Sequence, residues 1–210
     1  MRKPFTLVEV LIAMSVLSVF LLGLMQFYSS TETVLSSGVE RTEMFERARI
    51  AMDMMANDLT CIYYSQTDDD LTPFEYSENS YFQVSTVRPE KLNTEAKTNI
   101  VGAKYSWNTS KQTLVYSYSD KDTFDVKSAT FGNDTELVEG VTDFSVKPYY
   151  GNGKKILPSL VVIRMELVDS KTLRRIQANA SAKEAILKNA NKREFRRMVV
   201  IDRGQPKPKL

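Results

Sequence analysis

An apolar run near the start of the chain, residues 5–28, constrains the fold more than any other feature, because Glu9 is its only charged residue. A helix of about 20 apolar residues is long enough to cross the hydrocarbon core of a bilayer. Arg2 and Lys3 precede the run, as in a secretory signal peptide. A cleaved signal has a shorter apolar core that ends in small residues. This run ends in Met25-Gln26-Phe27-Tyr28, so it fits a cleaved signal poorly.

Glu9 also distinguishes the run from a plain membrane anchor. A carboxylate inside a membrane-spanning helix is costly, and ionisable residues in such helices usually mark a function. Simple tolerance of the charge near the membrane interface is the alternative explanation.

The residues Phe5-Thr6-Leu7-Val8-Glu9-Val10-Leu11-Ile12-Ala13 resemble the N-terminal motif of type IV pilins and type II secretion pseudopilins. That motif has an aromatic first mature residue and a glutamate at the fifth position. The resemblance implies that Met1 to Pro4 form a leader, which a prepilin peptidase removes between Pro4 and Phe5. It also implies methylation of the new amino group on Phe5. The family usually has glycine before the cleaved bond, whereas this chain has Pro4.

The physical role of the motif follows from its charges. A free amine at Phe5 would be positively charged, and Glu9 is the only anion in the apolar run that could meet it. Opposite charges attract more strongly in a low dielectric than in water, whereas apolar contact gives lipid-embedded helices little reason to prefer each other. We therefore expect Glu9 to act in assembly by pairing with the amine of a neighbouring subunit.

Composition limits the rest of the chain to one globular domain of ordinary size, because 210 residues also include a long helix. The single Cys61 excludes an intramolecular disulfide, and we expect it to be a small buried residue. The chain has no histidine, which removes the usual general base and the common zinc ligands. We therefore predict that the protein is not an enzyme.

Helical periodicity continues beyond the apolar run. Apolar residues follow each other by three and four positions and form one stripe: Phe45, Ala48, Met52, Met55, Leu59 and Ile62. Charged residues occupy the other positions, and we place Asp53 and Asp58 among them on the surface. The pattern predicts one helix from about Phe5 to Ile62, with residues 29–64 forming an amphipathic part that enters the globular domain.

The remainder predicts strands, because segments rich in aromatic and β-branched residues alternate with turn residues. The predicted strands are Tyr81–Val87, Gly102–Trp107, Gln112–Ser119, a segment around Phe144 to Tyr149, Leu160–Val168 and Met198–Ile201. A short helix is predicted from Ser181 to Asn189. The fold class is therefore α+β and pilin-like: a long N-terminal helix packed on an antiparallel sheet domain over residues 65–203, with a disordered tail at 204–210.

Three adjacent aspartates, Asp68, Asp69 and Asp70, offer the carboxylate oxygens that Ca²⁺ prefers. They lack the alternate spacing and the glycine of an EF-hand loop, so we favour a solvated turn within a loop from Ser65 to Tyr76. Asp120, Asp122 and Asp125 receive the same interpretation. No cofactor is predicted.

Three later segments resemble the J-type minor pseudopilins of type II secretion and related minor pilins. They are Leu137-Val138-Glu139-Gly140-Val141-Thr142-Asp143-Phe144, Leu157 to Ile163, and Phe195 to Val200. Residues Arg49 to Leu59 are similar to the helix end of the same proteins. The resemblance implies a minor subunit at the tip of a filament, where it starts assembly with other minor subunits.

Charge is distributed unevenly along the chain. Residues 1–150 hold 13 basic and 21 acidic residues, whereas residues 151–210 hold 15 basic and 5 acidic residues. Several of the basic residues gather in one short region: Lys188, Lys192, Arg193, Arg196, Arg197 and Arg203. A solvated face, a docking face for an acidic neighbour and a nucleic-acid contact all remain open, although nucleic acid is the least favoured partner.

Three classes of function remain. The first is a structural pseudopilin, stored in the bacterial inner membrane with its C-terminal domain in the periplasm. Its implied partners are other minor and major pseudopilins, prepilin peptidase and the secretion assembly platform. The second is a minor type IV pilin for adhesion or DNA uptake. The third is a membrane-tethered enzyme that uses carboxylates such as Asp68 or Asp120.

Overall fold

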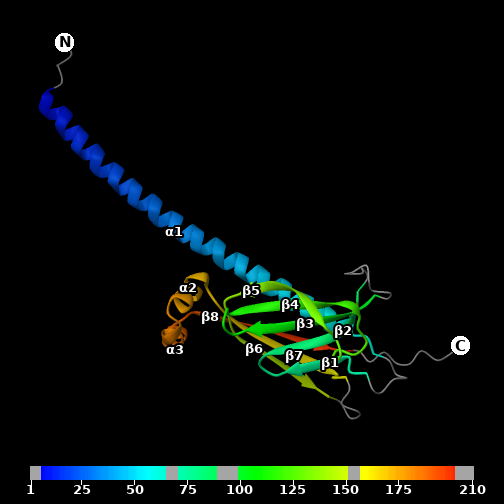
Figure 1. The fold of residues 1–210 in the computed structure, drawn as a ribbon. Coiled ribbons are helices and arrows are strands. Elements are labelled where there is room, and N and C mark those ends of the chain that lie inside the picture. The colour runs from blue at the N-terminus through cyan, green and yellow to red at the C-terminus, as the bar shows by residue number, and fades with distance from the viewer. Residues whose placement is uncertain (1–5, 65–70, 89–98, 151–156, 202–210) are drawn as a thin grey trace. The chain divides into compact units, whose positions relative to one another are not determined.

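The computed structural model describes residues 6–64, 71–88, 99–150 and 157–201 (Figure 1). The chain divides into two compact units, and the boundary between Glu43 and Met44 falls inside the first helix. In chain order the elements are α1 (Leu7–Thr60), β1 (Phe74–Ser77), β2 (Tyr81–Val87), β3 (Ile100–Asn108), β4 (Thr113–Asp122), β5 (Phe131–Glu139), β6 (Val141–Tyr149), β7 (Leu160–Val168), α2 (Ser170–Ala178), a 3₁₀ turn (Ala180–Ala182), α3 (Lys183–Lys188) and β8 (Lys192–Val200).

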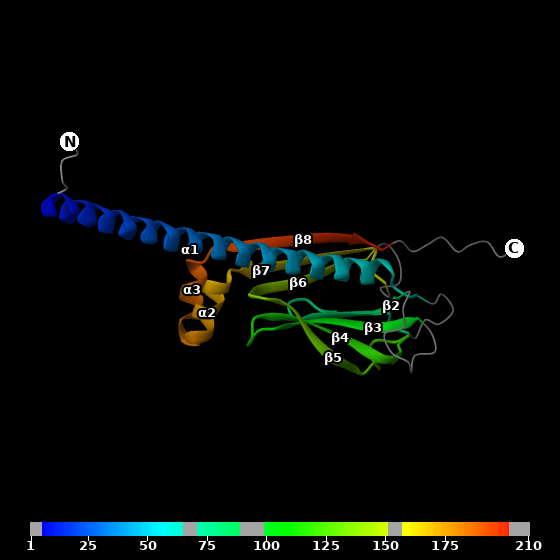
Figure 2. The ribbon, with the colours of Figure 1, turned by 90° about the horizontal axis from the view of Figure 1, so that it is seen from above.

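The predicted α+β fold class is confirmed: one long N-terminal helix is followed by antiparallel sheets. Strands β1 to β5 form a five-stranded sheet, here called sheet A, in which sequential strands are neighbours. Strands β6, β7 and β8 form a three-stranded sheet, here called sheet B. All strand pairs are antiparallel, and Figure 2 shows the two sheets as separate layers.

The C-terminal part of α1 belongs to the second unit and supplies one wall of its core. The predicted apolar stripe is confirmed, because Ala48, Met52, Met55 and Leu59 are buried. Ala51 and Ala56 are buried beside them, and these small residues allow the helix backbone to approach the sheets closely. Apolar side chains from both sheets complete a single core cluster: Phe82, Val84, Tyr105, Leu114, Phe144, Val146, Ile163, Met165 and Val199.

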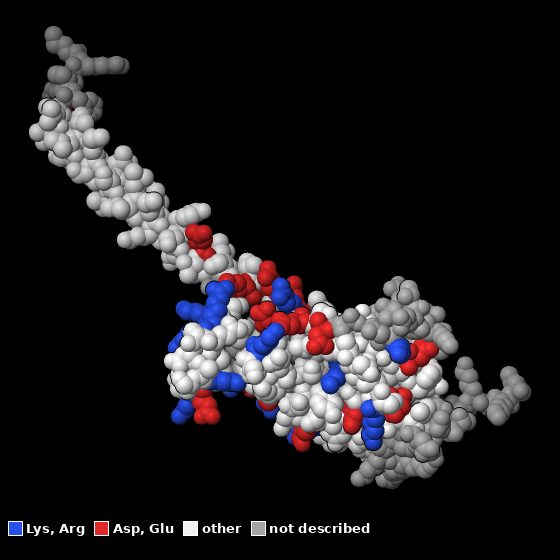
Figure 3. All heavy atoms as spheres, in the orientation of Figure 1, with Lys and Arg blue, Asp and Glu red and all other residues white. Residues whose placement is uncertain are grey.

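The N-terminal part of α1 belongs to the first unit and has the opposite character. Its large apolar side chains from Leu7 to Tyr28 are exposed, and Figure 3 shows this stretch almost entirely without charge. The serine hydroxyl groups there are satisfied inside the helix: Ser15 donates to the carbonyl of Leu11 at 2.7 Å and Ser18 to that of Met14 at 2.8 Å. The helix therefore presents an apolar surface with few free polar groups.

Gly140 joins the two sheets, between the end of β5 and the start of β6. Its φ of +80° is one that side-chain-bearing residues rarely adopt. A Cβ there would also lie 2.7 Å from the carbonyl oxygen of Val168, whose own N–H donates to the Gly140 carbonyl at 3.0 Å. Beside it, Trp107 donates its indole N–H to the carbonyl of Val141 at 3.0 Å. The glycine in the Leu137–Phe144 segment is thus required by the local backbone.

Several sequence predictions of elements were accurate and others were wrong. Strands β2 and β7 have the predicted bounds. The predicted loop from Ser65 to Tyr76 was wrong at its end, because Phe74 begins β1. The last strand begins at Lys192 rather than Met198, and α1 ends at Thr60 rather than Ile62. Strand β5 and helix α2 were not predicted.

Helix α2 has a local cause that the sequence does contain. Asp169 is its N-cap, and its carboxylate accepts a hydrogen bond from the Thr172 N–H at 2.7 Å. Such a bond satisfies one of the free N–H groups at the helix start. Leu173 and Ile176 then pack against Val168, and Ile186 and Leu187 of α3 lie against this small cluster.

Candidate functional site

The first candidate site is the start of α1, where Glu9 meets Thr6. The Glu9 carboxylate accepts hydrogen bonds from the Thr6 N–H at 2.9 Å and from the Thr6 hydroxyl at 3.0 Å. The Glu9 N–H in turn lies 3.4 Å from the Thr6 hydroxyl. This reciprocal arrangement is a capping box, which satisfies N–H groups at a helix start. The spacing Thr-x-x-Glu was a signal for Thr6 that the sequence prediction did not use.

The helix that carries Glu9 is long and apolar enough to span a membrane. Glu9 lies in its first turn, at the end where the helix dipole favours a negative charge. The carboxylate is exposed on a helix whose neighbouring side chains are apolar and also exposed. Among the described residues of this unit, the Glu9 side chain is therefore accessible to a cationic group of another chain.

Two predicted sites lie outside the residues that the structure describes. Pro4 and Phe5, the predicted processing site, precede the first described residue. Asp68, Asp69 and Asp70, the predicted turn with acidic residues, also fall outside it. Cleavage between Pro4 and Phe5 therefore stays a prediction, and so does the solvated turn, rather than a calcium site, at Asp68 to Asp70.

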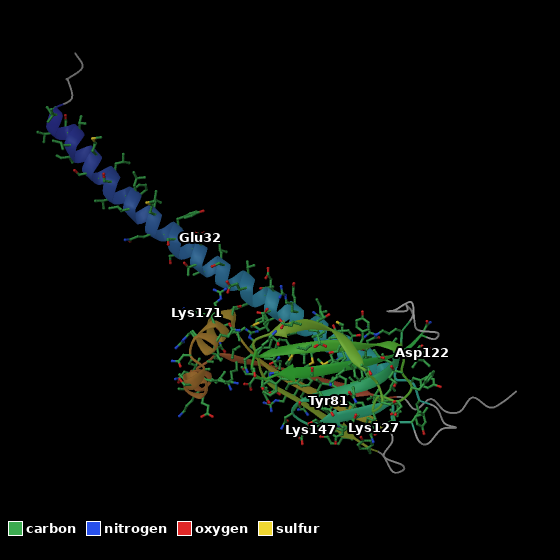
Figure 4. All side chains as sticks on the ribbon, in the orientation of Figure 1. Glu32, Tyr81, Asp122, Lys127, Lys147 and Lys171 are labelled. Atoms are coloured by element: carbon green, nitrogen blue, oxygen red, sulfur yellow. The ribbon has the colours of Figure 1, made fainter. Side chains whose placement is uncertain are left out.

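The acidic residues around the end of β4 are partly described. Asp125 accepts hydrogen bonds from the backbone N–H groups of Thr72 at 3.3 Å and Lys127 at 3.2 Å, so its carboxylate stabilises the loop. Asp122 and Lys127 are labelled in Figure 4. In the described part of the chain, no group of three or more Asp, Glu, Cys or His residues could hold a metal ion.

A second cluster forms around Asp58, near the end of α1, and corrects the sequence prediction. Asp58 was predicted on the charged surface, but it is only 1% exposed. Arg88 donates to both carboxylate oxygens, at 3.2 and 2.6 Å, and the Tyr105 hydroxyl donates at 2.7 Å. The Arg88 guanidinium lies 5.4 Å from the centre of the Tyr116 ring. We call these four residues the Asp58 cluster.

The Asp58 cluster joins the helix end to sheet A, because Tyr105 lies on β3 and Tyr116 on β4. A buried carboxylate needs hydrogen bonds and an opposite charge to offset its loss of hydration, and the cluster supplies both. Cys61, three residues later, was predicted to be buried; this was wrong, since it is only partly buried. We assign the Asp58 cluster a structural role.

The two tyrosines of the Asp58 cluster predict a loss of stability at alkaline pH. Burial raises the pKa of Tyr116 from its ordinary value of 10 to about 12. Burial, and then the charge and hydrogen bond of Asp58, raise the pKa of Tyr105 well above 10. The folded state therefore keeps protons that the unfolded state loses, so the free energy of unfolding falls as pH rises from about 10 towards 12.

Urea unfolding of the detergent-solubilised chain at several pH values between 9 and 12 measures this fall. Each tyrosine contributes a slope of at most about 1.4 kcal/mol per pH unit. Tyr116→Phe removes one titrating group and should make the fall shallower than in the wild type. Equal slopes in the two proteins would show that Tyr116 does not keep its proton on folding.

The basic residues of the C-terminal part do not share one face. Arg193 stacks on the Phe45 ring at 4.3 Å, and Arg197 lies 3.4 Å from Asp53, so both point towards α1. Arg196 lies on the opposite face of sheet B, in register with Arg164. Others lie elsewhere: Figure 4 labels Lys171 on α2, and Lys192 at the start of β8 lies 2.8 Å from Glu166. Arg203 is outside the described residues.

No protein-family model matches the chain, and no curated protein matches it either. The functional interpretation therefore depends on the N-terminal motif and on the geometry of the helix that carries it.

Proposed function

We propose that the chain is a minor pseudopilin, a structural subunit of a type II secretion pseudopilus. It is stored in the inner membrane by the N-terminal part of α1 and assembles into a filament through that helix. The observation that carries the proposal is Glu9, an exposed carboxylate on the first turn of a helix that is otherwise uncharged and largely apolar over residues 7–28. The resemblance of residues 5–13 to the pilin motif supplies the class of protein.

The exposed side chains of the first unit support the assembly step. A helix that is apolar around its circumference is stable in lipid or against other apolar helices. Its hydroxyl groups bond to carbonyls of the preceding turn, as at Thr31 and Phe27 at 2.8 Å, which suits both environments. Packing against neighbouring helices would fill the filament core, and the pairing of Glu9 with a neighbour's amine would set the register between subunits.

The proposed partners follow from this role. They are other minor and major pseudopilins, the prepilin peptidase that acts between Pro4 and Phe5, and the assembly platform that supplies force. The proposed role is not catalytic. The globular unit would lie in the periplasm, on the side of the membrane opposite the leader.

The mass of the protein extracted from membranes tests this proposal. We expect an N-terminus that begins at methylated Phe5, because processing would expose the amine that Glu9 is proposed to meet. Fragment masses must place the methyl group on Phe5 rather than on a lysine. An N-terminus that still begins at Met1 in assembled material would contradict the proposal.

A further inference from the structure

Strand β8 forms one edge of sheet B. It pairs with β7 over its nine residues. Within the described part of the chain, no strand pairs with its other side. Figure 2 shows β8 at the margin of the sheet. An edge of this length presents a row of backbone groups that can bind another strand.

The register fixes which backbone groups point outwards. Ile201 donates its N–H to the carbonyl of Ser159 at 2.9 Å, and this bond continues the β7–β8 register. Antiparallel strands exchange hydrogen bonds at every second residue. Odd-numbered residues of β8, such as Arg197 and Val199, therefore bond to β7. The N–H and C=O groups of Glu194, Arg196, Met198 and Val200 point to the open edge.

The same even-numbered residues present their side chains on the outer face of sheet B, away from α1. Met198 is 65% exposed and Val200 is 70% exposed. Arg196 has no ion-pair partner among the described residues. Arg164, its neighbour on β7, lies 3.2 Å from Glu194 and 3.8 Å from Asp143 and Glu166. The edge thus combines one free cation with two exposed apolar side chains.

A depression of about 490 Å³ adjoins this edge, and its lining includes Lys147, Val162, Arg164, Glu194 and Arg196. The Glu194 carboxylate is paired with Arg164 at 3.2 Å. Lys147 is already paired with Glu78 at 3.2 Å. Among the described residues of the lining, Arg196 is therefore the cation left to pair with a carboxylate that enters the depression from the edge. A residue with an apolar side chain, two positions along the same strand, would lie beside Met198.

Charge argues against a second copy of the chain as the occupant. Strand β8 holds four basic residues and one acidic residue, so two copies of β8 would repel each other. Strand β5, the far edge of sheet A, is acidic, with Asp134, Glu136 and Glu139 and no basic residue. Its pairing with β4 shifts register at two places, however. Such irregularities bend an edge and oppose further pairing.

We infer that the open edge of β8 binds an acidic, extended strand from a different protein chain, which adds to sheet B as a fourth strand. Backbone hydrogen bonds to Arg196 and Met198 would supply affinity, and the alternation of acidic and apolar side chains would supply specificity. The inference depends on the proposed function in one respect only: it takes the partner to be another subunit of the filament.

An acetylated and amidated peptide of alternating Val and Glu, about nine residues long like β8, is the probe. It is titrated against the detergent-solubilised full chain. Residue-resolved amide hydrogen exchange is then measured with and without the peptide. We expect new protection at the N–H groups of Arg196 and Met198, and little change at those of Arg197 and Val199, which already bond to β7. A peptide with Lys in place of Glu should bind less well.

Met198→Pro and Met198→Ala are matched variants, because both shorten the side chain and only proline removes the outward N–H. The proline variant should weaken peptide binding about tenfold or more relative to the alanine variant, the cost of one lost backbone hydrogen bond with its acceptor left unpaired. Arg196→Glu, which does not alter the backbone, should weaken the Glu peptide and favour the Lys peptide.

Equal binding by the proline and alanine variants, binding without protection at Arg196 and Met198, or no binding of the Glu peptide would each overturn the inference. If protection of these amides increases with protein concentration when no peptide is present, the edge binds a second copy of the chain. That result would also overturn the inference. Processing and methylation at Phe5 do not depend on the edge of β8. A negative result in the peptide experiments would therefore leave the proposed function intact.

Discussion

Replacing Glu9 by glutamine is expected to leave the protein in the membrane while reducing its co-assembly with other subunits by about tenfold or more. The apolar residues between positions 7 and 28 are unchanged, so insertion should persist. The substitution removes the only negative charge of that run, and with it the proposed pairing to a neighbour's amine. Membrane fractionation, followed by quantification of the subunits that co-purify in detergent, measures both effects.

The capping box makes glutamine the informative substitution at Glu9. A Glu9 carboxylate that serves only its own helix would bond to Thr6, as it does here at 2.9 and 3.0 Å. Glutamine can also complete a capping box, so Glu9→Gln keeps the cap and loses the charge. Thr6→Ala is the converse control, because it removes the hydroxyl and keeps the carboxylate.

We expect Thr6→Ala to assemble nearly as well as the wild type, and Glu9→Gln to fail. The opposite pattern, with normal assembly by Glu9→Gln and loss in Thr6→Ala, would reduce Glu9 to a helix cap and remove the central support for the pseudopilin proposal. Failure of both variants to reach the membrane fraction would show that the helix start governs insertion instead.

The parts of the fold that the sequence predicted well are those with a strong local pattern. The three-and-four spacing from Phe45 to Leu59 identified the face of α1 that packs on the sheets, and alternation over Leu160–Val168 identified β7. Strand β5 was not predicted, because it contains Gly132, Asp134 and Glu136, and these residue types are uncommon in strands. An edge strand also need not be apolar.

Prediction of the sites was limited in a different way. The pattern Thr6-x-x-Glu9 is local, so the capping box could have been found from the sequence. The burial of Asp58 could not, because its partners Arg88 and Tyr105 lie 30 and 47 residues further along the chain. By helical spacing alone, Asp58 belongs with the charged residues of the surface. Only the closure of sheet A against the helix end brings a counter-charge to it.

Replacing Asp58 by alanine should therefore destabilise the globular unit strongly, by about 3–5 kcal/mol. Asp58 is 1% exposed and accepts hydrogen bonds from Arg88 and Tyr105. Its removal would leave the Arg88 guanidinium, which is largely buried, without the carboxylate that offsets its loss of hydration. Urea unfolding of the detergent-solubilised chain, followed by the fluorescence of Trp107, the single tryptophan, measures the loss.

Asp53→Ala is the matched control for this measurement, since Asp53 lies on the same helix and its side chain is 53% exposed. It lies 3.4 Å from Arg197 and 4.0 Å from Arg49, but exposed ion pairs contribute only about 0–1 kcal/mol. A double-mutant cycle of Asp58→Asn with Tyr105→Phe then isolates the hydrogen bond between the two side chains from the pairing with Arg88. If Asp58→Ala and Asp53→Ala unfold at the same urea concentration, the helix end is not held to sheet A by the buried charge. Apolar packing of Met55 and Leu59 would then be sufficient to hold the helix on the sheets.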